Sequence, residues 1–344
     1  MKLFFSLALF AAFLLCPAAC ADGVREGLAL AGREALPALF PFFVASGLLV
    51  RSGLAERLGR AAARPLARLY GLPPEAAPAV ILGLTGSYPV GAATVAELLQ
   101  QGALSREAAA RVNAFCNCAS PGFCIGLVGL GVFGSARTGA VLYGIHALSA
   151  LLTGLVVARG PMAQSAGGRA AAAPREGFAF AFCGATQQAA RTALTVTAFL
   201  TVFSVLLRLL RPALRALPYG DMLAGLIELT NGLDELTLLP LTICAQLTLA
   251  SFLLGFGGLA VQFQARALTA PFALPSGAFT LGKLLHGTIA AVCTALLFQL
   301  SPRALAVFAG AAAPPRAFNL TGAVLLGVLV LLLIWGGKST KNKI

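Results

Sequence analysis

Two hydrophobic stretches, residues 79–135 and 221–300, are interrupted by Gly, Pro, Asn and acidic residues in the same order. Backbone that is not helical has unpaired N–H and C=O groups, which a bilayer tolerates only where protein buries them or a wet cavity meets them. Interrupted segments at corresponding points of two halves are typical of the substrate site of repeat-built transporters. The pattern therefore predicts a substrate-binding site formed by the interrupted parts of the helices.

The composition agrees with a membrane location, because 58% of the residues are hydrophobic, 11% are charged and the mean hydropathy is +0.87. A soluble domain carries about a quarter charged residues, and several apolar runs here approach the roughly 20 residues that cross hydrocarbon. We predict an all-α polytopic membrane protein. The net charge of +13 does not indicate nucleic-acid binding, since the basic residues fall in short segments between spans.

The first half contains a predicted re-entrant helical hairpin over residues 79–100. Each arm is too short to span the bilayer alone, and Gly86, Pro89 and Gly91 allow the chain to reverse. The alternative is a kinked span with a packed Pro. Residues 112–133 predict a transmembrane helix interrupted at residues 117–122, where Pro121 leaves carbonyls unpaired. A span over residues 138–157 follows.

The second half repeats this order, with a helix over residues 186–207, a broken segment over 222–239, a Gly-interrupted segment and a His-bearing helix. Residues 225–232 correspond to 83–91, residues 255–258 to 116–122, and His286 to His146. This correspondence predicts two inverted repeats, each with a re-entrant helical hairpin and an interrupted transmembrane helix.

The predicted organisation has five parts. Residues 1–22 form a first transmembrane helix, with a cleaved signal peptide as the alternative. The first repeat covers 23–159, a low-complexity linker 160–177, the second repeat 178–300, and a C-terminal transmembrane helix over 320–335 with a basic tail lies in 301–344. With both termini cytoplasmic, seventeen basic residues lie inside and eight outside, although the cluster of Arg208, Arg211 and Arg215 falls outside.

The eight cysteines lie mainly in apolar segments and predict no disulfide framework. Cys116, Cys118 and Cys124 lack the spacing of a metal cluster and have no His close in sequence, so we interpret them as packing residues. We predict no metal and no other cofactor.

The interruptions predict a site for a small anionic substrate, because helix N-terminal ends present free N–H groups and a positive dipole to a carboxylate. Polar side chains near them would orient the ligand. The predicted substrate-binding residues are Gly86, Ser87, Tyr88, Gly91, Asn117, Ser120, Gly122, Thr230, Asn231, Gly232, Gly257, Gly258 and Gln262.

Ionisable residues within spans are costly and require an explanation. Glu228 is the candidate for coupling to an ion or proton, and a hydrogen bond that anchors the hairpin turn is the open alternative. His146 and His286 are further coupling candidates, for which helix-to-helix hydrogen bonding is favoured over a proton relay. We expect Lys283 to extend to the cytoplasmic edge.

The chain has no nucleophile elbow, phosphate-binding loop or zinc-protease motif, so we predict no catalytic residue and no enzymatic activity. Nucleotide hydrolysis within this chain would not drive transport.

Five short motifs resemble the YlbJ-type sporulation integral membrane proteins, which carry the nucleoside-recognition "Gate" domain. They are FPFF at 40–43, GSYPVGA at 86–92, AFCN at 114–117, GGL at 257–259 with Gln262, and LLH at 284–286. The family's usual second Asn is replaced here by Cys118-Ala119.

The resemblance implies a role in sporulation and in moving dipicolinate, an aromatic dicarboxylate, across the membrane around the forespore. A nucleoside-type carrier and a non-transporting scaffold for spore cortex or envelope assembly are the alternatives. The expected partners are the lipid bilayer, the small anion and a coupling ion or proton, and no nucleic acid. The sequence leaves the oligomeric state open.

Overall fold

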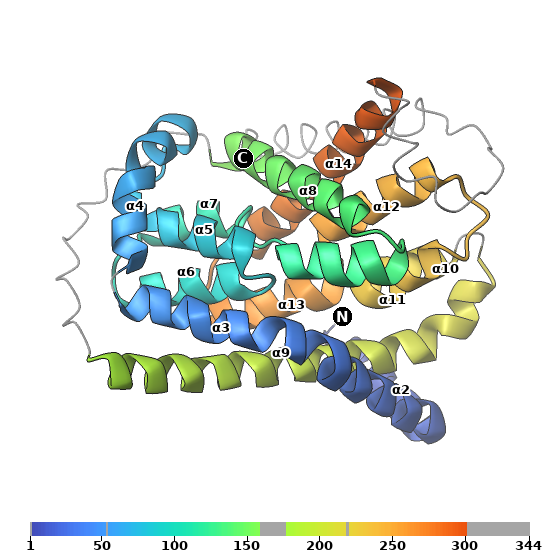
Figure 1. The fold of residues 1–344 in the computed structure, drawn as a ribbon. Helices are drawn as coiled ribbons and strands as arrows, with labels where there is room; N and C mark the ends of the chain where they lie inside the picture. Colours follow the sequence, from blue (N-terminus) through green and yellow to red (C-terminus); the bar gives the residue numbers. More distant parts are fainter. Residues whose placement is uncertain (1, 53, 159–176, 218–219, 301–344) are drawn as a thin grey trace, which may run out of the picture.

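The computed structural model describes residues 2–52, 54–158, 177–217 and 220–300, and every regular element within these residues is helical. The long helix α9 (Phe178–Arg215) lies along one side of the molecule (Figure 1). Helices α2 (Pro17–Leu30) and α3 (Leu36–Arg51) pack against α9, and the other helices form the rest of the bundle. The predicted all-α fold is confirmed.

The N-terminal segment is bent. Helix α1 (Lys2–Leu15) ends just before Pro17, and the apolar segments on either side of the break meet at 98°. Proline has no N–H and its ring crowds the preceding turn, which accounts for the bend. In place of the single helix predicted over residues 1–22, α2 continues through the π-helical turn η1 (Ala31–Ala35) into α3. The boundary after residue 22 thus falls inside a helix.

The first half contains the predicted hairpin and the predicted interrupted segment. The hairpin turn is at residues 86–89, and residues 114–120 form an irregular break. Tyr70 and Phe115 stack at a ring-centroid distance of 5.4 Å in the core beside the hairpin. The elements of this half are α4 (Leu54–Pro65), η2 (Leu66–Tyr70), η3 (Pro74–Ala76), α5 (Ala77–Thr85), α6 (Val90–Gln100), α7 (Arg106–Asn113), η4 (Phe123–Val132) and α8 (Ala136–Val157).

The second half also has both predicted breaks, at Glu228 and at Gly257. A core cluster joins the two halves, since Tyr88 and Ala119 pack in it with Leu233 and Leu254. The elements that follow α9 are α10 (Gly220–Ile227), α11 (Leu229–Leu236), α12 (Ile243–Phe256), α13 (Gly258–Thr269), η5 (Ala270–Phe272) and α14 (Ser276–Leu300).

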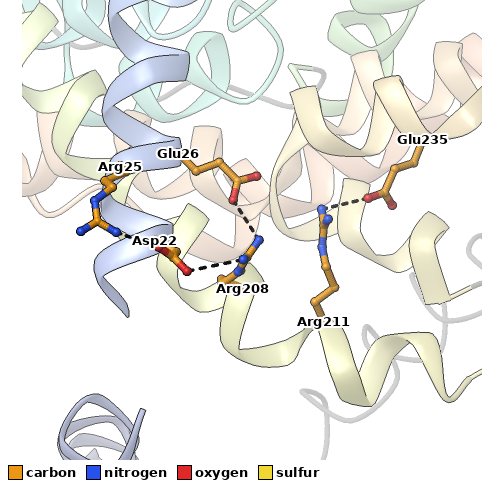
Figure 2. A network of polar contacts seen from close by, with 6 residues as sticks. All are labelled: Asp22, Arg25, Glu26, Arg208, Arg211 and Glu235. Atoms are coloured by element: carbon orange, nitrogen blue, oxygen red, sulfur yellow. Dashed lines mark hydrogen bonds and ion pairs between the residues drawn. The ribbon is translucent and has the colours of Figure 1, made fainter. Parts of the chain in front are cut away.

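Helix α9 is longer than the predicted helix over residues 186–207 and includes the arginine cluster. Figure 2 shows how acidic residues on other helices pair with this cluster. Arg208 lies 3.6 Å from Asp22 and 3.9 Å from Glu26 on α2, and Arg211 donates to Glu235 on α11 at 2.9 Å. Arg208 and Arg211 therefore connect α9 to α2 and α11.

Four helical segments among the described residues are long and apolar enough to cross a membrane, or five if the bent N-terminal pair counts as one span. The four are Ala136–Val157, Phe178–Arg215, Ile243–Phe272 and Ser276–Leu300. Together with the composition, they make this an integral membrane protein. The predicted span over residues 320–335, the basic tail and almost all of the predicted linker lie outside the described residues.

Candidate functional site

Four helix breaks meet near the middle of the molecule: residues 86–89, residues 114–120, Glu228 and Gly257. Hairpin α5–α6 lies on the left of Figure 1 and α10–α11 on the right, with their turns toward the middle. Ser87 and Glu228, one from each turn, line the same cavity. We call Tyr88, Asn117, Glu228, Gly257 and Lys283 the break centre.

Each hairpin packs directly on the break of its own half. A Cβ atom added at Gly91 would overlap the carbonyl of Cys116, and one added at Gly258 would lie 3.1 Å from the backbone nitrogen of Leu229. Across the halves, the Tyr88 hydroxyl donates to the carbonyl of Leu254 on α12. The order of interruptions in the sequence thus corresponds to a contact between them in space.

Asn117 organises the first break. Its side chain is fully buried, and its Oδ1 accepts the backbone N–H of Ala92, in the first turn of α6, at 2.8 Å. Its Nδ2 donates to the carbonyl and to the side-chain oxygen of Asn113, both at 2.9 Å. The side chain therefore joins α6, α7 and the irregular segment.

Lys283 on α14 is the main residue that the sequence analysis misplaced. Its side chain is 1% exposed, its Nζ donates to the Asn117 carbonyl at 2.8 Å, and its Nζ lies 5.1 Å from the centre of the Tyr88 ring. None of the ion pairs among the described residues includes Lys283. The prediction that it extends to the cytoplasmic edge is wrong, because the freed carbonyl and the aromatic face hold it inside.

The position of Lys283 relative to His286 in the sequence indicates that it lies inside the molecule. It precedes His286 by three residues, so both side chains lie on one face of the helix. Because His286 was already a candidate, its helical neighbour could have been included.

His146 and His286 are in contact, with ring centroids 4.4 Å apart. His286 Nε2 lies 2.9 Å from the His146 carbonyl, so this nitrogen donates the bond. His146 Nε2 accepts the Ala119 N–H at 2.9 Å, so the proton of the neutral ring is on Nδ1. The favoured interpretation, a hydrogen bond between helices, is present.

Cys118 lies beside the two histidines, which sequence spacing did not indicate. Its Sγ atom and a nitrogen of each ring lie within 4.8 Å of one another, and all three residues are buried. One Cys and two His are a ligand set typical of Zn²⁺. However, the Ala119 N–H already occupies His146 Nε2, and the Lys283 ammonium group bonds to the adjacent Asn117. Because both contacts disfavour a metal cation, the absence of a metal site stays our prediction.

Glu228 caps α11. Its carboxylate accepts the backbone N–H of Thr230 at 3.1 Å and both the backbone N–H and the side-chain Nδ2 of Asn231 at 2.8 Å. Glu228 is 2% exposed, and these bonds satisfy N–H groups that have no partner within the helix. The anchoring alternative from the sequence therefore describes its contacts, and a coupling role stays a prediction.

The fourth break depends on glycine. Gly257 has φ of 78° and Gly258 has φ of 70°, a region that other residues rarely adopt. Gln262 is 1% exposed, its Nε2 lies 3.5 Å from the Phe256 carbonyl, and its Oε1 has no hydrogen-bond partner within the described part of the chain. Gln262 therefore faces the carbonyl freed by the break and retains an unused acceptor.

A cavity of about 50 Å³ separates the hairpin turns from α9 and α3, with Ser87, Tyr88, Glu228, Thr230 and Gln264 among its lining residues. Gln264, which is buried, was not predicted. The lining does not include Asn117, Ser120, Gln262 or either histidine.

Other predicted residues have structural contacts. Ser120 accepts the Phe123 N–H at 3.1 Å, Gly122 is exposed, and Gly232 packs on the backbone of Gly225. These contacts order the neighbouring helices, and they give no direct evidence of ligand binding.

Comparison with known proteins supports the resemblance. Residues 33–135 match the family model described as Gate, nucleoside recognition. Over 332 residues the chain is 26% identical to the sporulation integral membrane protein YlbJ of Bacillus subtilis (strain 168), and the alignment covers 86% of this chain and 81% of that protein. No solved structure matches the chain. The two matches confirm the resemblance inferred from the sequence, to the YlbJ-type sporulation integral membrane proteins with a Gate domain.

Proposed function

We propose that this protein carries a small anionic metabolite, of the class of aromatic dicarboxylates such as dipicolinate, across the membrane around the forespore during sporulation. The observation that carries the proposal is Lys283, a buried lysine that forms no ion pair with the described residues and contacts the breaks at Tyr88, Asn117 and Gly257. A carboxylate would supply the missing negative charge, and the N-terminal ends of α6 and α11 would supply further donors.

The cavity lies beside the break centre, because Tyr88 and Glu228 line it and Lys283 does not, and its size sets a condition for this function. About 50 Å³ accommodates a few water molecules, whereas sites for small molecules enclose roughly 300–1,000 Å³. Binding therefore requires the hairpin turns to move apart. The enclosing surface is mostly apolar, which suits an aromatic ring. Four of its polar residues, Ser87, Tyr88, Glu228 and Thr230, lie at the hairpin turns, and Gln264 lies on α13.

A nucleoside carrier is the second candidate, because the matched family is described as nucleoside recognition. The unused acceptor of Gln262 and the buried amide of Gln264 suit a neutral, hydrogen-bonding ligand. Such a ligand would make no use of the positive charge that Lys283 can carry, and for this reason we favour the anion.

The test is uptake of labelled dipicolinate by proteoliposomes that contain the full chain. We expect saturable uptake that other aromatic dicarboxylates inhibit and uridine does not. Inhibition by uridine alone would select the nucleoside carrier. No uptake of either compound would favour the scaffold, and the arginine-rich helix α4 would then be the first region to mutate.

A further inference from the structure

Lys283 is surrounded by groups that carry no negative charge at neutral pH. The irregular segment contributes the Asn117 carbonyl and the thiols of Cys116 and Cys118, the first hairpin contributes the Tyr88 ring, and α8 and α14 contribute His146 and His286. A Cβ atom added at Gly257 would lie 3.4 Å from Lys283 Cε, so the fourth break also lies against the lysine side chain.

An ammonium group in such a place is costly, because one carbonyl and one aromatic face replace only part of the water it loses. A neutral amine still donates to the Asn117 carbonyl at much lower cost. An anion at the break centre reverses the balance, since an ammonium–carboxylate pair gains both charge attraction and a charge-assisted hydrogen bond.

We propose that Lys283 is the proton-coupling residue of the carrier, neutral in the empty site and protonated when the anion binds. This inference rests on the proposed function. In the step, the Lys283 amine takes one proton from solvent and forms an ammonium that pairs with one carboxylate. When the anion leaves on the other side of the membrane, the Lys283 ammonium releases its proton to the solvent there. One proton therefore crosses with each anion. By linkage, the two ligands strengthen each other's binding.

Other titratable groups at the centre are already committed to other bonds. The Glu228 carboxylate accepts three hydrogen bonds from its own helix. The Nε2 atoms of both histidines are fixed by backbone groups. Lys283 is the charged group at the centre that pairs with no acidic side chain of the described residues.

The experiment uses the purified full-length protein in detergent and dipicolinate as the ligand. Calorimetric titration at mildly alkaline pH, where the amine of the empty site has lost its proton, in two buffers with different ionisation enthalpies measures the number of protons taken up on binding. For the unaltered protein we expect about one proton per ligand bound. For Lys283→Arg, which cannot lose its charge, we expect binding without proton uptake. Lys283→Gln should weaken binding roughly 10-fold to 150-fold, the value of a hydrogen bond to a charged group.

Arg137→Gln removes an exposed charge and should behave as the unaltered protein. Ligand binding without proton uptake by the unaltered protein, or proton uptake by Lys283→Arg equal to that of the unaltered protein, would overturn the coupling role and leave the carrier intact. Absence of binding by the unaltered protein would overturn both. If Lys283→Arg is not monodisperse in gel filtration, the two-buffer titration of the unaltered protein decides alone.

Discussion

The two hairpins differ in how the N-terminus of their second helix is held. At α6 the cap comes from Asn117 in the neighbouring break, whereas at α11 it comes from Glu228 in the hairpin itself. The first hairpin and its break therefore form one hydrogen-bonded unit. The bonds of the Glu228 cap all stay within α11. The comparison indicates that α10–α11 is freer to move when a ligand enters, while α5–α6 stays fixed beside Lys283.

The largest expected effect is a complete difference in accessibility, and it concerns the side of the membrane from which each hairpin enters. Inverted repeats require α5–α6 and α10–α11 to open to opposite sides of the membrane. An epitope tag inserted after the exposed Gly102 and one inserted after Leu238, which is 81% exposed, should be accessible from opposite sides. If both tags are accessible from the same side of the membrane, the two halves are not inverted repeats.

The next largest effect is on the free energy of unfolding, and it should differ between substitutions at two glycines, one from each half. Gly91→Ala places a methyl group on the Cys116 carbonyl and should lower the free energy of unfolding by about 3 kcal/mol. Gly257→Ala meets its neighbours at 3.3–3.6 Å and strains only the backbone, at a cost of about 1 kcal/mol. Thermal unfolding in detergent measures both. Equal effects would contradict the tighter packing of the first hairpin.

Asn117→Ala should have the next largest effect on stability. It leaves the Ala92 N–H buried and unpaired, at a cost of about 1–3 kcal/mol, and it should also reduce dipicolinate uptake because Lys283 loses its neighbour's fixed position. Gln187→Ala on the exposed face of α9 is the matched control and should change neither property. A stable variant with normal uptake would remove Asn117 from the site.

Glu228→Ala should cost about 1 kcal/mol through loss of the helix cap. Glu228→Gln keeps an acceptor for the Thr230 and Asn231 amides, so it should retain most of the stability and the proton uptake on ligand binding. If calorimetry shows that Glu228→Gln binds dipicolinate without proton uptake, coupling belongs to Glu228 and the assignment to Lys283 is wrong.

The smallest effect is expected at the contact between α9 and α11. Arg211 and Glu235 are partly exposed, 24% and 17%, and such pairs contribute about 0.5 kcal/mol. Arg211→Gln, which removes the Arg211–Glu235 contact drawn in Figure 2, should therefore change the unfolding temperature very little. A large loss of uptake without loss of stability would instead show that this contact controls the movement of the second hairpin.

Local chemistry explains why the breaks were predictable from the sequence. Gly86, Pro89, Pro121 and Gly257 interrupt apolar segments, and their effect depends on residues close by in the chain. Pro17 bends the N-terminal segment for the same local reason, although a single helix was predicted over residues 1–22.

Long-range contacts were not predictable in this way. The bond from Lys283 to Asn117 and the approach of Cys118 to both histidines join residues far apart in sequence. The length of α9 also depended on partners, because Asp22, Glu26 and Glu235 pair with its arginines. Sequence patterns therefore identified where helices stop, and tertiary contacts determined which side chains meet there.

A density map of the full chain with dipicolinate bound tests the central claim most directly. The account predicts ligand density between the turns of the two hairpins, with a carboxylate within hydrogen-bond distance of Lys283 Nζ and α10–α11 displaced more than α5–α6. Density outside the break centre, or a ligand there with no carboxylate near Lys283, would contradict it.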